Sequence, residues 1–281
     1  MSTATQPVTQ AVDDRPSEVV VISHSQLFYW WPVWAVGFLM ALLSYVYGYK
    51  VAFVPPGTVA ERGAEVKGLN GKRDVLIAPA DKHLPPEADS DALKQPALQM
   101  VASNDLGVIW AVTLCLVIVI THAHLRGIRA LGVILLIGFV TILFALLGWW
   151  EPILRWVQVI DIHMTASSYL SISVFLFVVW LITVLFFDRL VYMVFTRGQL
   201  RVRMAIGEGE TVYDTRGMVV ERHRDDLFRH WLLGFGSGDL TVRTSGPNPR
   251  QFEMPNVLSI GRKLRVINTM LQEREVVRGT R

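Results

Sequence analysis

Cysteine is nearly absent from this chain of 281 residues, because Cys115 is the only one. A single thiol makes no intramolecular disulfide and no cluster of metal-binding thiolates, so disulfide-rich domains and cysteine-based metal sites are excluded. Cys115 lies in the apolar run "AVTLCLVIVIT", where a low dielectric disfavours the thiolate. We therefore expect a packed and unreactive side chain.

Charge is also scarce, because only 18% of the residues are Asp, Glu, Lys or Arg while 52% are hydrophobic. The mean hydropathy of +0.38 is too high for an ordinary soluble protein. Four apolar stretches free of charge are long enough to cross a hydrocarbon core, which needs about 20 helical residues. The lack of intramembrane charge disfavours a pump or an ion channel. We predict a four-helix membrane domain over residues 28–187, with helices at about 28–49, 106–125, 127–150 and 168–187.

Arginines in the short loops predict the orientation of these helices. Arg126 and Arg129 lie in "HAHLRGIR", where the second predicted helix ends and the third begins, and Arg189 follows the fourth. The positive-inside rule places both regions in the cytoplasm. Four crossings then put both termini in the cytoplasm, with residues 1–27 as an N-terminal tail and residues 50–105 as an external loop. That loop is rich in proline, and only "RDVLIAP" in it has the composition of a short strand.

Catalytic and metal-binding motifs are missing as well. The sequence has no Gly-x-Ser-x-Gly elbow and no His-Glu-x-x-His helix. His122 and His124 stand two residues apart near a helix end, so their side chains point in different directions, and no Cys, Asp or Glu lies within five residues. We expect a polar turn there rather than a metal site, and we predict neither an enzyme nor a bound cofactor or metal.

Glycine is concentrated in "HWLLGFGSGDLTVRTSG", residues 230–246, where Gly234, Gly236 and Gly238 have the spacing of some phosphate-binding loops. A dinucleotide fingerprint needs a strand before its glycines and a helix after them. The order is reversed here, because "DDLFRHWLL" predicts a short helix capped by Asp225 and "DLTVRT" predicts a strand. We interpret the three glycines as a structural turn, with a phosphate loop as the alternative.

A separate domain begins near residue 188, where long apolar runs give way to short strand-like stretches. Beyond Pro255, "NVLSIGRKLRVINTMLQ" predicts a helix capped by Asn256, with an apolar stripe that closes the open end of a small barrel. Residues 188–281 are thus predicted as a cytoplasmic, mainly-β domain with a closing helix. About six strands are expected, in "LVYMVFT", "QLRVRMAI", "GEGETVYD", "GMVVERHR", "DLTVRT" and "QFEMP".

The same region, from "FTRGQLRV" through "LLGFGSGDLTVRTSG" to "FEMPNVLSIGRKL", resembles the bacterial pleckstrin-homology-like domain of membrane-anchored bacterial proteins. The resemblance covers about the last third of the chain, and "LLGFGSGDLTVRTSG" is its most specific part. It implies a seven-stranded curved sheet closed by a C-terminal helix and a non-catalytic binding or assembly role. Together with the four predicted helices, it predicts a multi-pass protein of the bacterial cytoplasmic (inner) membrane.

The predicted cytoplasmic domain is also the basic part of the chain. Residues 188–281 contain sixteen Lys and Arg against eleven Asp and Glu, a balance of +5. Arginine suits bidentate contacts with phosphate or carboxylate. The candidate contact residues are Arg197, Arg201, Arg203 and Arg222, and the alternative is a solvated basic surface.

These observations predict a protein embedded in the lipid bilayer that has a binding or scaffold role. Its cytoplasmic domain would engage anionic lipid headgroups or a protein partner, including a second copy of the chain through an exposed strand edge. No nucleic acid is expected as a partner. The alternative function is a subunit of a transporter or envelope complex.

Overall fold

The computed structural model describes residues 18–66, 68, 70–82, 98–122, 128–204, 209–223, 226, 228–246 and 248–279. The chain divides into two compact units. One unit joins Met1–Pro32, Cys115–Trp149 and Leu176–Arg281, and the other joins Val33–Leu114 and Trp150–Phe175.

Three helices are long and apolar enough to cross a membrane, which agrees with three of the four predicted spans. The apolar segments extend over Gln26–Tyr47, Asp105–His122 and Ala166–Leu190. Their α-helical parts are α1 (Trp31–Tyr47), α2 (Asp105–His122) and α5 (Ala166–Ile182). A fourth apolar helix, α3 (Ile128–Leu146), is shorter over its described apolar part, Leu131–Leu146.

The ends of these helices differ from the predicted ends. The first helix was expected from residue 28, but a 3₁₀ turn, η1 (Gln26–Trp30), precedes α1, and Tyr49 already belongs to a strand. The third was expected to reach residue 150, but Gly148 has a φ of 68° and α4 (Trp150–Gln158) begins after it. A left-handed glycine commonly ends a helix, because it has no Cβ to oppose that conformation.

In the unit that joins Val33–Leu114 and Trp150–Phe175, side chains of α1, α2 and α5 form a small core. Met40, Ala41 and Tyr169 are buried, and Trp110 packs against them. The indole Nε1 of Trp110 donates to the carbonyl of Val33 at 3.2 Å. Gly37 packs so closely against the Ser173 hydroxyl that a Cβ would overlap it. A small residue therefore lets α1 and α5 approach closely.

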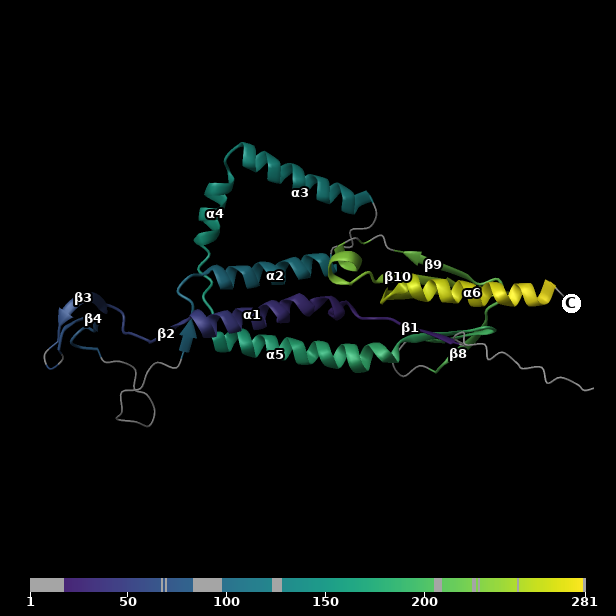
Figure 1. Cartoon of the computed structure of the whole chain (residues 1–281), viewed down its shortest axis with the longest axis horizontal. Helices are drawn as coiled ribbons and strands as arrows, with labels where there is room; N and C mark the ends of the chain where they lie inside the picture. Colours follow the sequence, from purple (N-terminus) through teal and green to yellow (C-terminus); the bar gives the residue numbers. More distant parts are fainter. Residues whose placement is uncertain are drawn as a thin grey trace, which may run out of the picture. The chain divides into compact units, whose positions relative to one another are not determined.

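The predicted external loop contains two short antiparallel sheets. β2 (Tyr49–Val51) pairs with β5 (Leu98–Met100), and β3 (Val59–Glu65) pairs with β4 (Lys72–Ile77). β4 coincides with the strand predicted in "RDVLIAP", whereas no strand was predicted for its partner β3. We call β3 and β4 the outer hairpin (Figure 1).

Seven of the described strands and one helix form a β domain in the other unit. A four-stranded antiparallel sheet has the order β1-β6-β7-β8, and a three-stranded one has the order β11-β10-β9. The closing helix, α6, was predicted and extends over Ile260–Gly279. The strands are β1 (Glu18–Ile22), β6 (Tyr192–Thr196), β7 (Gln199–Arg203), β8 (Thr211–Asp214), β9 (Val219–His223), β10 (Gly238–Arg243) and β11 (Gln251–Val257).

The strand β1 comes from the segment that was predicted as an N-terminal tail. It pairs antiparallel with β6, in a register that sets Val20 opposite Val194 and Val21 opposite Met193. "EVVVI" is rich in β-branched residues, which favour strands. The β domain is therefore built from segments that precede and follow the apolar helices in the sequence. Residues 188–281 contain six of its seven described strands.

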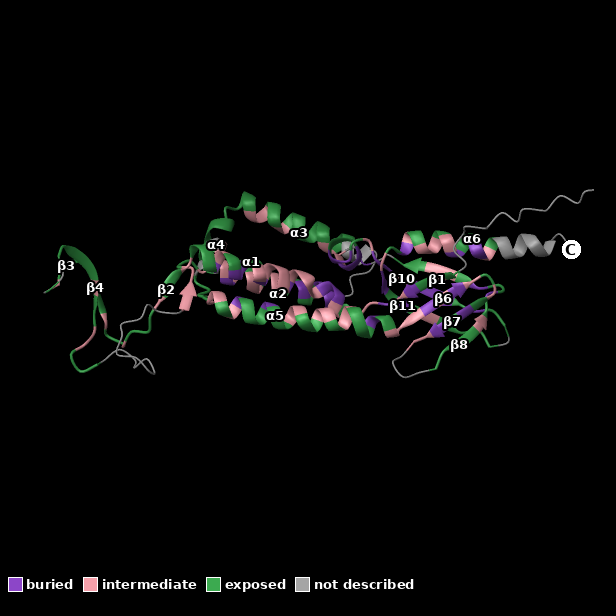
Figure 2. Cartoon of the chain, turned by 60° about the horizontal axis from the view of Figure 1, so that its bottom comes forward, coloured by how far each residue is buried: buried purple, intermediate pink, exposed green. Residues whose placement is uncertain are grey.

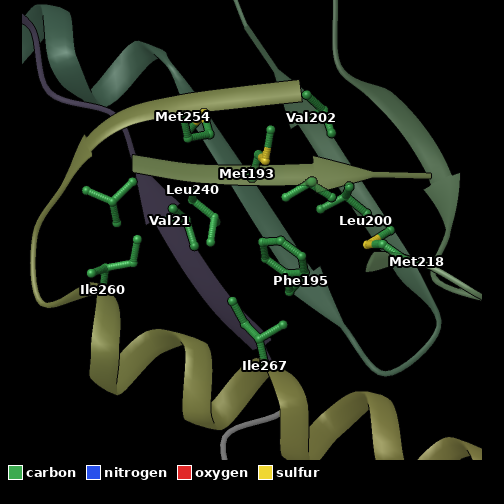
Figure 3. Close-up of a cluster of buried hydrophobic side chains, with 12 residues drawn as sticks. Val21, Met193, Phe195, Leu200, Val202, Met218, Leu240, Met254, Ile260 and Ile267 are labelled. Atoms are coloured by element: carbon green, nitrogen blue, oxygen red, sulfur yellow. The ribbon is translucent and has the colours of Figure 1, made fainter. Parts of the chain in front are cut away.

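The core of the β domain lies between the two sheets and α6. β6 and β7 bury alternate residues, and Leu240, Val242 and Met254 face them from β10 and β11. Val21 is fully buried, and the strand that carries it passes close to α6, which contributes Ile260 and Ile267 (Figure 3). In α6, the side chains that the structure describes include both buried and exposed positions (Figure 2). Each fully buried aliphatic side chain contributes about 1.5–3 kcal/mol of burial free energy.

One side chain of the membrane helices differs from its predicted environment. Cys115 on α2 is exposed in the structure, although a packed thiol was expected. An exposed side chain on an apolar helix is compatible with contact to lipid, where the thiolate is also disfavoured.

Candidate functional site

The glycine-rich segment forms a compact loop between two elements of the β domain. A single π-helical turn, η4 (Phe228–Leu233), precedes it, and β10 begins at Gly238. Phe235 and Gly236 are both left-handed, with φ of 49° and 79°. The N–H of Gly236 donates to the His230 carbonyl at 2.9 Å. We call residues 230–238 the glycine loop.

A capping carboxylate precedes the π-helical turn, as the sequence indicated, but its position differs. Asp226 accepts from the backbone N–H of Arg229 at 3.0 Å. Asp225, the predicted cap, lies outside the described residues. The turn is π-helical, although an ordinary short helix was predicted from "DDLFRHWLL". A Cβ at Gly234 would lie 2.7 Å from Cε1 of Tyr29, so glycine is needed there for packing.

Tyr29, just before α1, is buried against the glycine loop. Its hydroxyl donates to Oδ1 of Asn256 at 2.9 Å and lies 3.0 Å from Oγ of Ser237 and 3.4 Å from Nδ1 of His230. Asn256 was predicted to cap the closing helix. It lies instead in β11, and its Nδ2 donates to the carbonyl of His24 at 2.8 Å.

Trp31, the first residue of α1, is also attached to the glycine loop. Its Nε1 donates to the Leu233 carbonyl at 3.0 Å, and its ring stacks on Phe235 with centroids 5.5 Å apart. These bonds and the Tyr29 contacts fix the glycine loop to the start of a candidate membrane span. The loop therefore has a structural role at the junction between the helix and the β domain.

A buried ionic cluster supports the same junction. Arg229 is 3% exposed, and its Nη2 donates to Oδ2 of Asp239 at 2.9 Å. Burial acts to raise the pKa of Asp239, but hydrogen bonds from His230 and from the Asn256 N–H, together with the Arg229 charge, outweigh it and hold that pKa below its usual range. The charges of Arg229 and Asp239 are therefore paired with each other inside the fold.

The β domain has one hollow of mixed charge. It has a volume of about 400 Å³ and is bounded by the segment before α1 and the outer face of β9, β10 and β11. His24, His223, Arg243 and Glu253 are among its lining residues. His24 is held by Asp188, with Nδ1 2.9 Å from Oδ2. Both acidic and basic side chains line it, so the lining has no single sign of charge.

A second hollow of the β domain is basic. It has a volume of about 640 Å³ and lies between β9, the glycine loop and the first turns of α6. Its cations are Arg222, Arg262 and Arg265, and none of the described residues that line it is acidic. Nη1 of Arg222 lies 3.2 Å from where a Cβ at Gly261 would be, so that glycine leaves room for the guanidinium. We call this surface the basic hollow.

The arginines predicted from the sequence do not form one cluster. Arg201 and Arg203 lie on β7, and Arg197 lies between β6 and β7, whereas Arg222 lies on β9 in the other sheet. Arg201 has Glu210 at 3.9 Å.

Arg222 is instead joined by Arg262 and Arg265 of α6, which were not among the predicted contact residues. Their spacing of three residues puts both side chains on one face of a helix, and this was the signal available in the sequence. Lys263, between them, is half-buried, and burial lowers the pKa of its ammonium group.

Within the described ranges, no group of three His, Cys, Asp or Glu side chains is placed to hold a metal ion. Comparisons of the chain with family models, with curated proteins and with solved structures find no match.

Proposed function

We propose that this protein is a non-catalytic binding or scaffold protein, anchored in a bacterial cytoplasmic membrane, whose β domain engages anionic groups at the cytoplasmic surface. The observation that carries the proposal is the basic hollow, because three arginines line it and the described part of its lining contains no acidic residue. Guanidinium groups remain charged at all physiological pH values and bind phosphate or carboxylate through paired hydrogen bonds. The ligand is an anionic lipid headgroup or an acidic surface of a protein.

The architecture of the β domain supports this proposal. It has seven described strands in sheets of four and three and a closing helix, and we take this arrangement as support for the resemblance to the bacterial pleckstrin-homology-like domain. That family is associated with binding and assembly. In this chain the first strand precedes the membrane helices, so the domain assembles only when both ends of the helical region are on the same side of the membrane.

This requirement supports four crossings with both termini in the cytoplasm. β1 and β6 pair directly, so an even number of crossings must separate residue 22 from residue 192. Three crossings would place the two strands on opposite sides. α3 has 19 residues, which at 1.5 Å per residue extend about 28 Å, close to the thickness of a hydrocarbon core. α3 therefore supplies the fourth crossing in our proposal.

A second candidate function is a subunit of a transporter or envelope complex. Ser44 on α1 and Ser173 on α5 are buried, and their hydroxyls have no hydrogen-bond partner among the residues that the structure describes. Buried polar groups between membrane helices often line the path of a solute or contact another subunit. Both groups are uncharged, however, and the basic hollow lies in the β domain, so the binding function is favoured.

The proposed function is tested by photo-crosslinking in native membranes. A photoreactive residue in place of Asn268, which lines the basic hollow, should capture a phospholipid or a protein. The matched control is the same residue in place of Val212, which is exposed on β8. Capture from residue 268 that does not exceed capture from residue 212 contradicts the proposed function.

A further inference from the structure

We infer that the basic hollow binds the headgroup phosphate of an anionic membrane phospholipid, with Trp231 and Phe235 of the glycine loop inserted beside it in the membrane interface. This inference rests on the proposed function and names the ligand of the same site. Three observations lead to it: the attachment of the loop to a membrane helix, the exposure of its aromatic side chains, and the charge of the hollow beside them.

The attachment of the glycine loop fixes its distance from the membrane. Trp31 is the first residue of α1, and the 17 residues of that helix contain no charged side chain. Tryptophan at the end of such a helix favours the level of the headgroups. Because the Trp31 indole bonds to Leu233 and stacks on Phe235, the loop lies at the same depth as the start of the span.

The side chains that the loop exposes are those that favour a membrane interface. Trp231 is 76% exposed, Phe235 is 71% exposed and Leu232 is 49% exposed. Large apolar groups gathered in one exposed loop indicate contact with another apolar phase. Phe235 also has a left-handed backbone, an unfavourable conformation for a bulky residue that persists where surrounding contacts impose it. The contacts of Tyr29 and Trp31 provide that constraint, and they keep the Phe235 ring outward.

The basic hollow begins at the same residues. Phe235 and Gly236 line it together with Arg222 from β9 and with Arg262 and Arg265 from α6. An aromatic anchor at headgroup level therefore stands directly beside three guanidinium groups. A phospholipid presents the same two features in one molecule, because its phosphate is attached to an apolar glycerolipid body. An acidic protein surface would account for the arginines, but it would leave the exposed loop beside the bilayer unexplained.

The test measures lipid binding to the full chain in a neutral detergent by native mass spectrometry. Short-chain phosphatidylglycerol is titrated against phosphatidylcholine of the same acyl length. The hollow variant combines Arg222→Gln, Arg262→Gln and Arg265→Gln, and a control with the same change in charge combines Arg201→Gln, Arg216→Gln and Arg243→Gln. Each cation near an anionic surface accounts for roughly a fivefold preference at low salt, so three arginines account for about tenfold to a hundredfold after screening.

We expect the wild-type chain to prefer phosphatidylglycerol, the hollow variant to lose this preference by about tenfold or more, and the control to keep it. Replacing Trp231 and Phe235 by serine should weaken lipid binding as well. Inorganic phosphate and glycerol phosphate should compete poorly, because they lack the apolar body. If the hollow variant has a lower melting temperature than the control, the lipid preference is compared instead for the single substitution Arg262→Gln, at an exposed position of α6.

Equal affinity of the wild-type chain for the two lipids would overturn the inference, as would a hollow variant that keeps its preference. Full competition by inorganic phosphate would also overturn it, because the hollow would then take a free anion. Loss of preference in the control alone would overturn the inference as well, because the contact would then involve Arg201, Arg216 or Arg243. If the photoreactive residue at position 268 captures a protein and the chain shows no lipid preference, the proposed function stands and only the assignment of a lipid ligand is rejected.

Discussion

The β domain and the outer hairpin flank the same membrane helix in sequence, yet they use their strands differently. β6 and β7 bury every second residue, and Met193, Phe195, Leu200 and Val202 are at most 3% exposed. In β3 and β4, every residue except Ala64 and Val75 is exposed. Both regions form antiparallel ladders. The comparison teaches that hydrogen-bonded strands form without a core, whereas a stable sheet needs a second layer that covers one face.

The second layer of the β domain is assembled from distant parts of the chain. α6 covers the sheets from the C-terminal end, and β1 adds an edge strand from before the membrane helices. The outer hairpin has only its own 19 residues, Val59–Ile77, and none of its side chains is buried among the described residues. Mutations should therefore have large effects in the β domain and small effects in the hairpin.

The largest effect is expected for Val21→Asp, which places an unpaired carboxylate in the core between β6 and α6. Val21 is fully buried, and an uncompensated buried charge costs about 3–5 kcal/mol or more. We expect the β domain of the full chain to become sensitive to protease. Val59→Asp on β3, at a position that is 63% exposed, is the matched control and should leave the protease pattern of the β domain unchanged.

This experiment also tests whether β1 belongs to the domain in the membrane. If the chain with Val21→Asp keeps its protease resistance, β1 does not pair with β6, and the argument for an even number of crossings fails.

A smaller loss is expected for Gly236→Val in the glycine loop. Gly236 has a φ of 79°, and a β-branched residue in that region costs about 1–3 kcal/mol of folding free energy. Gly236→Asn should cost less, because asparagine tolerates the left-handed conformation. Thermal unfolding of the full chain in detergent measures both variants. A saturable rise in melting temperature when ATP or NAD is added to the wild-type chain would favour the phosphate loop that we rejected.

The sequence predicted those parts of the molecule whose signal is local. Charge-free apolar runs indicated the helices, and the alternation in "LRVRM" placed Leu200 and Val202 in the core of β7, where both are buried. "EVVVI" was predicted as part of a tail, because no neighbouring segment of the sequence indicated a strand with which it could pair. Its partner β6 lies about 170 residues later, and pairing at that separation leaves no local pattern.

The candidate site was predictable only in part for the same reason. Arg222 was predicted as a contact residue together with Arg197, Arg201 and Arg203, because all four belong to the basic domain. The structure places Arg222 beside α6 and leaves the β7 arginines on the other sheet. Which face of β9 meets α6 depends on the packing of two sheets, and side-chain alternation alone does not determine that choice. Arg262 and Arg265 form a site only together with Arg222, and the position of β9 that brings Arg222 to them was not predictable from the sequence.

A pH-dependent effect is expected for Asp239, which binds Arg229 and the Asn256 N–H. Its pKa is held below the usual range in the folded chain. The unfolded chain therefore takes up a proton first as the pH falls. The stability that Asp239 contributes is present above the usual carboxyl pKa of about 4 and is lost as the pH falls through that value and through the lower folded pKa.

Asp239→Asn should lower the melting temperature at neutral pH and flatten its fall in acid. The matched control is Asp74→Asn in the outer hairpin, where Oδ1 of Asp74 accepts from the Gly63 N–H at 3.0 Å at an exposed position. It should leave the acid response of the β domain unchanged. An unaltered acid response in Asp239→Asn would show that other groups govern it.

The smallest effect is expected for Leu76→Ser on β4. Leu76 is 63% exposed, so its replacement creates no cavity and leaves no buried polar group unpaired. Substitutions at such positions usually change the folding free energy by less than about 0.5 kcal/mol. The melting temperature of the full chain should therefore match that of the wild type within error, in detergent and in lipid nanodiscs. Leu240→Ser, at a position that is 1% exposed in β10, should by contrast lower it strongly, because it removes a core side chain and buries a hydroxyl. A loss of stability in Leu76→Ser comparable to that in Leu240→Ser would mean that the outer hairpin is covered in the folded protein, and the contrast between the two regions would no longer hold.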